Sequence, residues 1–133
     1  MKNNWIYFGI FIDSTAKAKN MQALEKNGVV IPAEWKRYNH HMTIAFHDGS
    51  ALSNKLYANY EQYLGTPVTL TVDGIGVSED AIAMRVRYNQ PIANKIPHIT
   101  MATPLNGKPV NSNKITEWID IEPYEINGWL KVY

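Results

Sequence analysis

The stretches HMTIAF (41–46) and HITMAT (98–103) share one pattern, and the rest of the chain is organised around them. Each runs histidine, apolar residue, threonine, apolar residue, alanine, which is typical of a buried β-strand. Residues two apart in a strand point to the same face. Each stretch therefore presents one imidazole and one hydroxyl on one face and apolar anchors on the other.

The spacing of the two stretches suggests a duplicated site. The histidines lie 57 positions apart (98 − 41), close to half of the 133 residues. This predicts two similar lobes, each giving a His/Thr pair to a shared cleft. One His-x-Thr triplet is a weak signal, but two inside matching apolar runs are much less easily produced by chance. The alternative is that both histidines are core residues satisfied by backbone partners.

Length and composition predict a single globular domain over residues 1–133, with 45% hydrophobic and 19% charged residues. The net charge of +1 argues against duplex DNA as a partner. The absence of cysteine excludes disulfides, thiolate metal sites and a cysteine nucleophile, and fits a cytoplasmic location.

No apolar run reaches transmembrane length, so we expect no membrane partner. The N-terminus lacks a cleavage site, so we expect it to be the mature start.

The order of the expected elements is mixed. We expect strands at 5–12, 29–31, 41–46, 68–72, 81–88 and 98–103, helices at 16–26 and 53–64, and a short helix capped within 111–113 that ends at 118. Residues 121–133 are interpreted as a bent strand pair, interrupted by Pro123 and turning at Asn127–Gly128. This order predicts an α+β fold and not a regular βαβ array.

The two motifs resemble those of the 2H phosphoesterase superfamily, which is named for two His-x-Thr/Ser motifs. Members include the LigT-type RNA 2′,3′-cyclic phosphodiesterases, cyclic phosphodiesterase domains of tRNA ligases, and phage enzymes that destroy cyclic oligonucleotide immune signals. HMTIAF is close to the LigT-type form. The resemblance implies two pseudo-symmetric lobes of mainly antiparallel sheet, with outer helices, around a central cleft. It covers the motifs, the size and the element order but not the loops; the interval between the motifs is short, and no long basic lid stands out.

The four motif residues suit acid–base chemistry on a phosphodiester. One imidazole would take a proton from water and the other would give one to the leaving oxygen, because the ordinary histidine pKa lies near working pH. The hydroxyls of Thr43 and Thr100 would donate to the non-bridging oxygens. The resemblance implies the same roles for His41, Thr43, His98 and Thr100, with no metal and no cofactor. A zinc site is the weaker alternative, because two histidines supply too few ligands.

Binding residues are harder to assign from sequence. Candidates for base stacking or phosphate contact are Tyr7, Trp35, Tyr38, Trp129 and Lys108, each with core packing or a solvated surface as the alternative. Further cations that would steer an anion are Lys36, Arg37, Arg85, Arg87 and Lys114. His40 precedes the first motif, so strand alternation predicts that it points to the opposite face.

These residues favour a metal-independent phosphodiesterase that hydrolyses a cyclic or 3′–5′ linked nucleotide phosphodiester. Two substrates stay open: a 2′,3′-cyclic phosphate on RNA or a nucleotide, and a cyclic oligonucleotide signal. The partner would then be a nucleotide or an RNA end. The alternative function is a nucleotide- or RNA-binding module that keeps the cleft without turnover.

Overall fold

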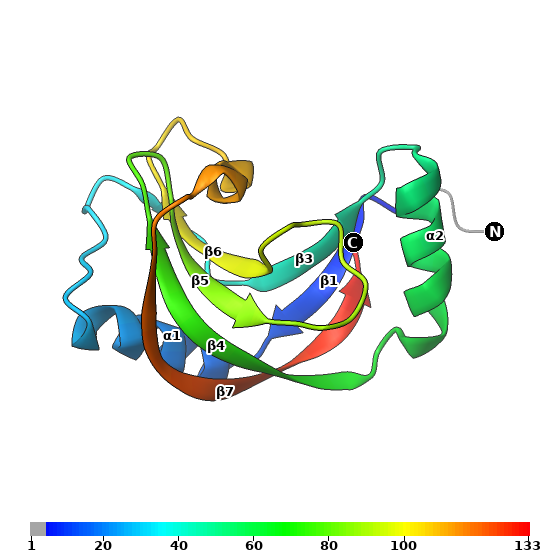
Figure 1. Cartoon of the computed structure of the whole chain (residues 1–133), viewed down its shortest axis with the longest axis horizontal. Coiled ribbons are helices and arrows are strands. Elements are labelled where there is room, and N and C mark those ends of the chain that lie inside the picture. Colours follow the sequence, from blue (N-terminus) through cyan, green and yellow to red (C-terminus); the bar gives the residue numbers. More distant parts are fainter. Residues whose placement is uncertain (1–4) are drawn as a thin grey trace.

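The computed structural model describes residues 5–133 and has an α+β fold, as predicted (Figure 1). Residues 1–4, the expected mature start, lie outside the described residues. The strands are β1 (Tyr7–Ile12), β2 (Lys36–Arg37), β3 (His41–Phe46), β4 (Pro67–Val77), β5 (Ile82–Arg87), β6 (His98–Thr103) and β7 (Trp118–Val132). The helices are α1 (Ser14–Lys26) and α2 (Ala51–Tyr60), with the 3₁₀ turns η1 (Glu61–Tyr63) and η2 (Pro109–Lys114).

Six strands form a closed antiparallel ring in the order β6-β3-β1-β7-β4-β5, because β5 also pairs with β6. The short β2 pairs with β6 next to the start of β3. Figure 1 shows α1 and α2 outside the curved sheet, at opposite ends. Apolar side chains from the strands and both helices build the main core, among them Phe8, Met42, Ile99 and Leu56. Both motif strands are thus anchored in this core by the residues between their histidine and threonine.

The two motif strands meet at a narrow seam. The only β3–β6 residue pair is Met42↔Ile99. Just before it, the N–H of Asn39 donates to the carbonyl of Thr100 at 2.9 Å. Between these two contacts the chain advances three residues on the β3 side, from Asn39 to Met42, but only one on the β6 side, from Thr100 to Ile99. His40 and His41 are therefore extra residues in a bulge, a device that re-aims side chains.

A buried polar network holds this bulge. Asn39 adopts a left-handed φ of 65°, which asparagine tolerates better than most residues. Its amide accepts a hydrogen bond from Asn20 of α1 at 3.0 Å and donates to the carbonyl of Lys17 at 3.0 Å. The hydroxyl of Tyr124 in β7 donates to the other end of Asn20 at 2.6 Å. Helix α1 and strand β7 thus fix the backbone that leads directly into His41.

The expected strand pair at 121–133 was wrong: β7 is one long strand. Gly128 lies between two ladders, paired with Ile12 of β1 and Val68 of β4, so backbone hydrogen bonding on both sides keeps it extended. A Cβ on Gly128 would collide with the carbonyl oxygen of Phe11, so the glycine serves close approach and not a turn. Pro123 lies where the β4–β7 register shifts, a position at which its missing N–H is tolerated.

Other boundaries also differ from the sequence prediction. Helix α2 begins at Ala51, because the Ser50 hydroxyl caps it by accepting from the N–H of Ser53. Segment 29–31 forms no strand; it anchors itself through the buried Ile31 instead. The short helix expected up to residue 118 is the earlier 3₁₀ turn η2, and Trp118 begins β7.

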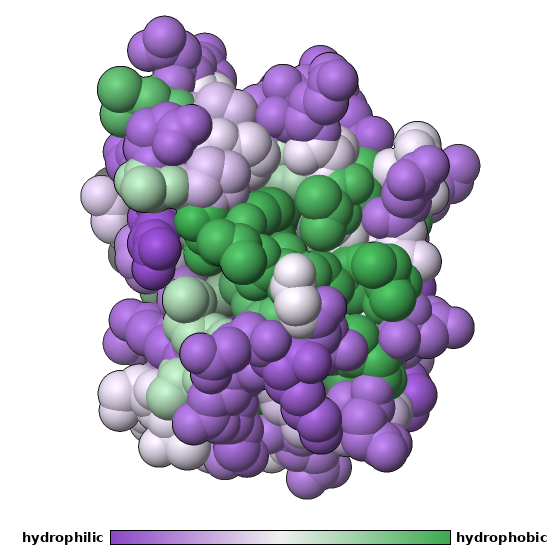
Figure 2. Space-filling view, turned by 90° about the vertical axis from the view of Figure 1, so that its left-hand side faces the viewer, coloured by the Kyte–Doolittle hydropathy of each residue, from purple (hydrophilic) through white to green (hydrophobic). Residues whose placement is uncertain are grey.

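The side of the molecule that holds the end of α1 and segment 27–35 carries an apolar band (Figure 2). Val30, 82% exposed, and Met21 line a pocket of about 370 Å³ there. Arg37 lines this pocket and also a larger one of about 530 Å³, the candidate site. The apolar band therefore adjoins the candidate site but contributes no motif residue to it.

Candidate active site

All four motif residues line one pocket of about 530 Å³. The pair Met42↔Ile99 explains this convergence, because it brings the two strands together between the histidine and the threonine of each motif. The other lining residues are Tyr7, Lys36, Arg37, Tyr38, His40, Phe46, Asn94, Lys108, Pro109, Val110 and Asn113. The pocket therefore collects residues from β1, β2, β3, β6, η2 and the loops between them.

The His41 ring packs against two aromatic rings of β1, Tyr7 and Phe11, whose own centroids lie 6.0 Å apart. Its centroid lies 4.9 Å from that of Tyr7 and 4.9 Å from that of Phe11, and both rings stack on it. Nε2 lies 3.0 Å from the hydroxyl oxygen of Thr43, while Nδ1 is buried with no hydrogen-bond partner among the described residues. Burial, and then the neighbouring His40, lower the pKa of His41 to about 4. The free protein therefore holds His41 neutral at pH 7.

The His98 ring has a defined tautomer. Its Nδ1 lies 2.8 Å from the carbonyl oxygen of Ile96, which only accepts, so Nδ1 carries the proton. The remaining nitrogen, Nε2, then carries the lone pair when the ring is neutral. Burial lowers the pKa of His98, and the Ile96 hydrogen bond partly opposes that shift. His98 is thus a neutral base with its tautomer set by the backbone.

The two threonines have different partners. Thr43 contacts its own imidazole, since the ring of His41 is the hydrogen-bond partner of its hydroxyl. Thr100 turns away from its imidazole: its hydroxyl lies 2.9 Å from that of Ser112 and 3.3 Å from the carbonyl oxygen of Pro109, both in η2. The turn η2 therefore orients Thr100, whereas Thr43 orients the His41 ring.

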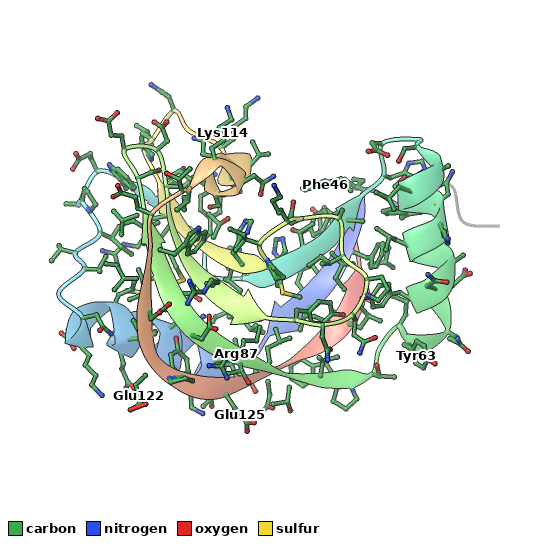
Figure 3. All side chains as sticks on the ribbon, in the orientation of Figure 1. Phe46, Tyr63, Arg87, Lys114, Glu122 and Glu125 are labelled. Atoms are coloured by element: carbon green, nitrogen blue, oxygen red, sulfur yellow. The ribbon has the colours of Figure 1, made fainter. Side chains whose placement is uncertain are left out.

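The charge around the pocket is positive. Lys36, Arg37 and Lys108 line it, and none of its described lining residues is acidic. Such a site attracts anions. The candidate cations Arg85 and Arg87 are engaged elsewhere: both bind Asp73, at 2.8 and 2.9 Å. Figure 3 accordingly shows Arg87 at the lower side of the sheet, far from η2, where Lys114 is labelled.

The predicted binding residues divide into two groups. Tyr7, Tyr38 and Lys108 line the pocket. Trp35 and Trp129 are absent from its described lining: Trp35 packs against the core, and Trp129 in β7 is 41% exposed beneath the Lys131 ammonium. Local sequence does not distinguish these aromatic residues, because their positions depend on which strands become neighbours.

The expectation for His40 was wrong. It was expected on the face opposite His41, yet both line the pocket. Strand alternation fails here because β3 begins only at His41 and the preceding Asn39 has a positive φ. Burial and the nearby Lys17 lower the pKa of His40. The site therefore contains a third imidazole, at its exposed rim.

Loop residues that no sequence pattern indicates also line the pocket. Asn94 lies in the connection before β6, and Asn113 and Val110 lie in η2; all three line the pocket. Ser112, 1% exposed, supports Thr100 from the same turn. The only available signal was proximity in sequence to the second motif, which does not specify how a loop folds back.

Within residues 5–133, no three His, Cys, Asp or Glu side chains gather closely enough to hold a metal ion together. In the same range, no helix has the length and apolar character needed to cross a membrane.

The comparisons with known proteins identify no relative. No protein-family model matches the chain, and no curated protein matches it. The function is therefore argued from the site.

Proposed function

We propose that this protein is a metal-independent phosphodiesterase that hydrolyses a nucleotide phosphodiester by acid–base catalysis. One observation carries the proposal: both His-x-Thr pairs line a single cationic pocket of about 530 Å³. A pocket of this size accommodates a small organic ligand. Its lysines and arginine suit a phosphate, and the rings of Tyr7 and Tyr38 suit a nucleobase. The site acts on RNA ends or nucleotides in the cytoplasm.

The roles of the two histidines follow from their nitrogens. His98 is the general base, because its Nδ1–H is occupied by Ile96 and leaves Nε2 free to take a proton from water. The water oxygen bonds to phosphorus, the bond to the leaving oxygen breaks, and that oxygen receives a proton from His41 in its protonated form. An anionic phosphodiester beside His41 favours this protonated form, against the burial that lowers its pKa in the free protein.

The two hydroxyls and the cations stabilise the negative charge that develops on the non-bridging oxygens. Thr43 has this role once the protonated His41 directs its Nε2–H at the leaving oxygen instead of at the threonine, since the hydroxyl hydrogen is then free to bind phosphate. Thr100 reaches phosphate by releasing its contact with η2.

The likeness of HMTIAF and HITMAT to the 2H phosphoesterase motifs supports the same chemistry. We extend the proposal to membership of that superfamily, with two pseudo-symmetric lobes that meet at the β3–β6 seam. The single residue pair at this seam supports a division there.

The test is turnover of adenosine 2′,3′-cyclic monophosphate and of cyclic di- and trinucleotides, with a chelator present. We expect product with at least one of them. His41→Ala and His98→Ala should each lower kcat by roughly 10²–10⁴-fold, the usual contribution of a general acid or base. His47→Ala is the matched control: its ring packs on Trp5 at 4.7 Å and does not line the pocket, so activity should persist.

Three results would contradict the proposal in different ways. Activity lost only on addition of the chelator would indicate a metal enzyme. Nucleotide binding without turnover would favour the binding module. Full activity in both histidine variants would exclude the acid–base roles.

A further inference from the structure

His98 lies at the junction of two pockets. Besides the 530 Å³ pocket, it lines a second one of about 360 Å³, and Asn94 and Asn113 line both. In Figure 3, Lys114, which lines the second pocket, is labelled at η2, and Phe46, which lines the first, is labelled to its right. The two pockets are therefore neighbouring compartments that share the imidazole assigned as the base.

The second pocket has its own aromatic and cationic groups. Trp118 lines it, with its ring centroid 6.5 Å from that of His98. The indole N–H already donates to the carbonyl of Ile115 at 3.3 Å, which fixes the ring. Lys95 and Lys114, both exposed, also line it, and no acidic residue is among its described lining. An aromatic ring beside two lysines suits a nucleobase and an anionic backbone.

We propose, on the basis of the phosphodiesterase function above, that the scissile phosphate carries a nucleoside on both sides, one in each pocket. A 2′,3′-cyclic mononucleotide has a single nucleoside and fills one compartment only. The substrate class is therefore an internucleotide phosphodiester in a linear or cyclic oligonucleotide. Hydrolysis adds water across one P–O bond and leaves a phosphate monoester on one nucleoside and a hydroxyl on the other.

Binding affinities test the proposal directly, because they do not depend on the different chemical reactivities of the two ligands. Affinities of adenylyl-(3′→5′)-adenosine and of adenosine 2′,3′-cyclic monophosphate are measured by calorimetry on the full chain carrying His41→Ala. We expect the dinucleotide to bind about 5–150-fold more tightly, since stacking of one more base contributes roughly 1–3 kcal/mol. Adding Trp118→Ala should remove this advantage.

The control variants separate stacking from folding. Trp129→Ala removes another indole of β7, one that lines neither pocket, and should preserve the advantage. Trp118 also covers Gly76 and contacts Ile115, so its loss can disturb the fold. Trp118→Leu keeps apolar volume without an aromatic face and should also lose the advantage, with an unchanged circular dichroism spectrum.

The outcomes distinguish the two proposals. The two-pocket inference is overturned by equal affinity for both ligands, or by an affinity advantage that survives in a folded Trp118→Leu variant. Neither result contradicts the proposed phosphodiesterase function. Absence of turnover of every phosphodiester by the wild-type protein overturns the proposed function itself.

Discussion

The two motif strands carry the same three-residue pattern in different surroundings. His41 of β3 sits in a bulge beside two aromatic rings, with no Nδ1 partner among residues 5–133 and with its own threonine on Nε2. His98 of β6 sits in a regular ladder, opposite Arg85, with Nδ1 bound to a backbone carbonyl. A repeated motif therefore does not produce a symmetric site, because the groups around each ring determine which nitrogen carries the proton.

This asymmetry has a structural origin. His98 is oriented by the carbonyl of Ile96, two residues before it in the chain, whereas His41 depends on Asn39, which helix α1 holds from outside the sheet. Disturbing the Asn20–Asn39–Tyr124 network should therefore affect the His41 side most directly, and β6 only through the backbone bond from Asn39 to Thr100.

The largest effect is expected for Asn39→Ala. The change leaves the buried NH2 group of Asn20 without its acceptor, which costs about 1–3 kcal/mol, and sets alanine at a φ of 65°, which costs about 1 kcal/mol more. We expect a loss of about 3 kcal/mol in the free energy of unfolding, measured by urea denaturation.

Two further variants isolate the cause. Asn39→Gly removes the amide but tolerates the positive φ, so it should be less destabilising by about 1 kcal/mol. Asn106→Ala changes an exposed loop asparagine on the β6 side and should shift stability by less than about 0.5 kcal/mol. Equal stability of Asn39→Ala and wild type would refute the role of the network.

The second effect is a loss of stability in mild acid. The unfolded chain binds a proton on residue 41 near the ordinary pKa of 6.5, whereas folded His41 binds it only near pH 4. Between these values the unfolded state holds more protons, so lowering the pH destabilises the fold. From the size of the shift, His41 should contribute a loss of up to about 3 kcal/mol between pH 6.5 and pH 4.

Urea denaturation of wild type and His41→Phe over pH 4.5–6.5 checks this. Phenylalanine can pack on the rings of Tyr7 and Phe11 as the imidazole does but does not titrate, so the pH slope of this variant should be shallower. The lowered pKa of His98 leaves a residual slope in both proteins. His47→Phe retains both buried imidazoles and should follow wild type; identical slopes for His41→Phe and wild type would show that His41 does not titrate as argued.

The structural features that depend on residues close together in the chain are predicted well from the sequence. Alternating apolar residues identify both motif strands, and good helix formers after Asp13 identify α1. The presence of both His/Thr pairs at one pocket agrees with the expectation of a shared cleft. These features follow from strand periodicity and local capping, which residues close in sequence determine.

The remainder depends on contacts between distant residues. Asn127–Gly128 has the composition of a hairpin turn, yet strands on both sides keep it extended. His40 breaks strand alternation because Asn39 is held by α1. Trp118 and Trp129 are both tryptophans of β7, and only the fold places Trp118 beside His98 and Trp129 away from both pockets. Long-range pairing and packing decide each case.

The smallest effect is expected for Ser112→Ala, which acts on the β6 side. Ser112 is 1% exposed, and its hydroxyl lies 2.9 Å from that of Thr100. Losing this bond should cost about 1 kcal/mol of stability, because Thr100 keeps its contact with the Pro109 carbonyl. The proposed activity should fall by less than about tenfold, since Thr100 is less firmly oriented but still present.

Comparison with Thr100→Val decides whether Ser112 acts through Thr100. If it does, the double variant Ser112→Ala/Thr100→Val should be no less active than Thr100→Val alone, because the hydroxyl that Ser112 orients is already gone. Additive losses of kcat would instead mean that Ser112 contributes to the pocket independently. Ser14→Ala, at an exposed position on α1, should change neither stability nor rate measurably, and so shows the size of effect that a serine outside the site produces.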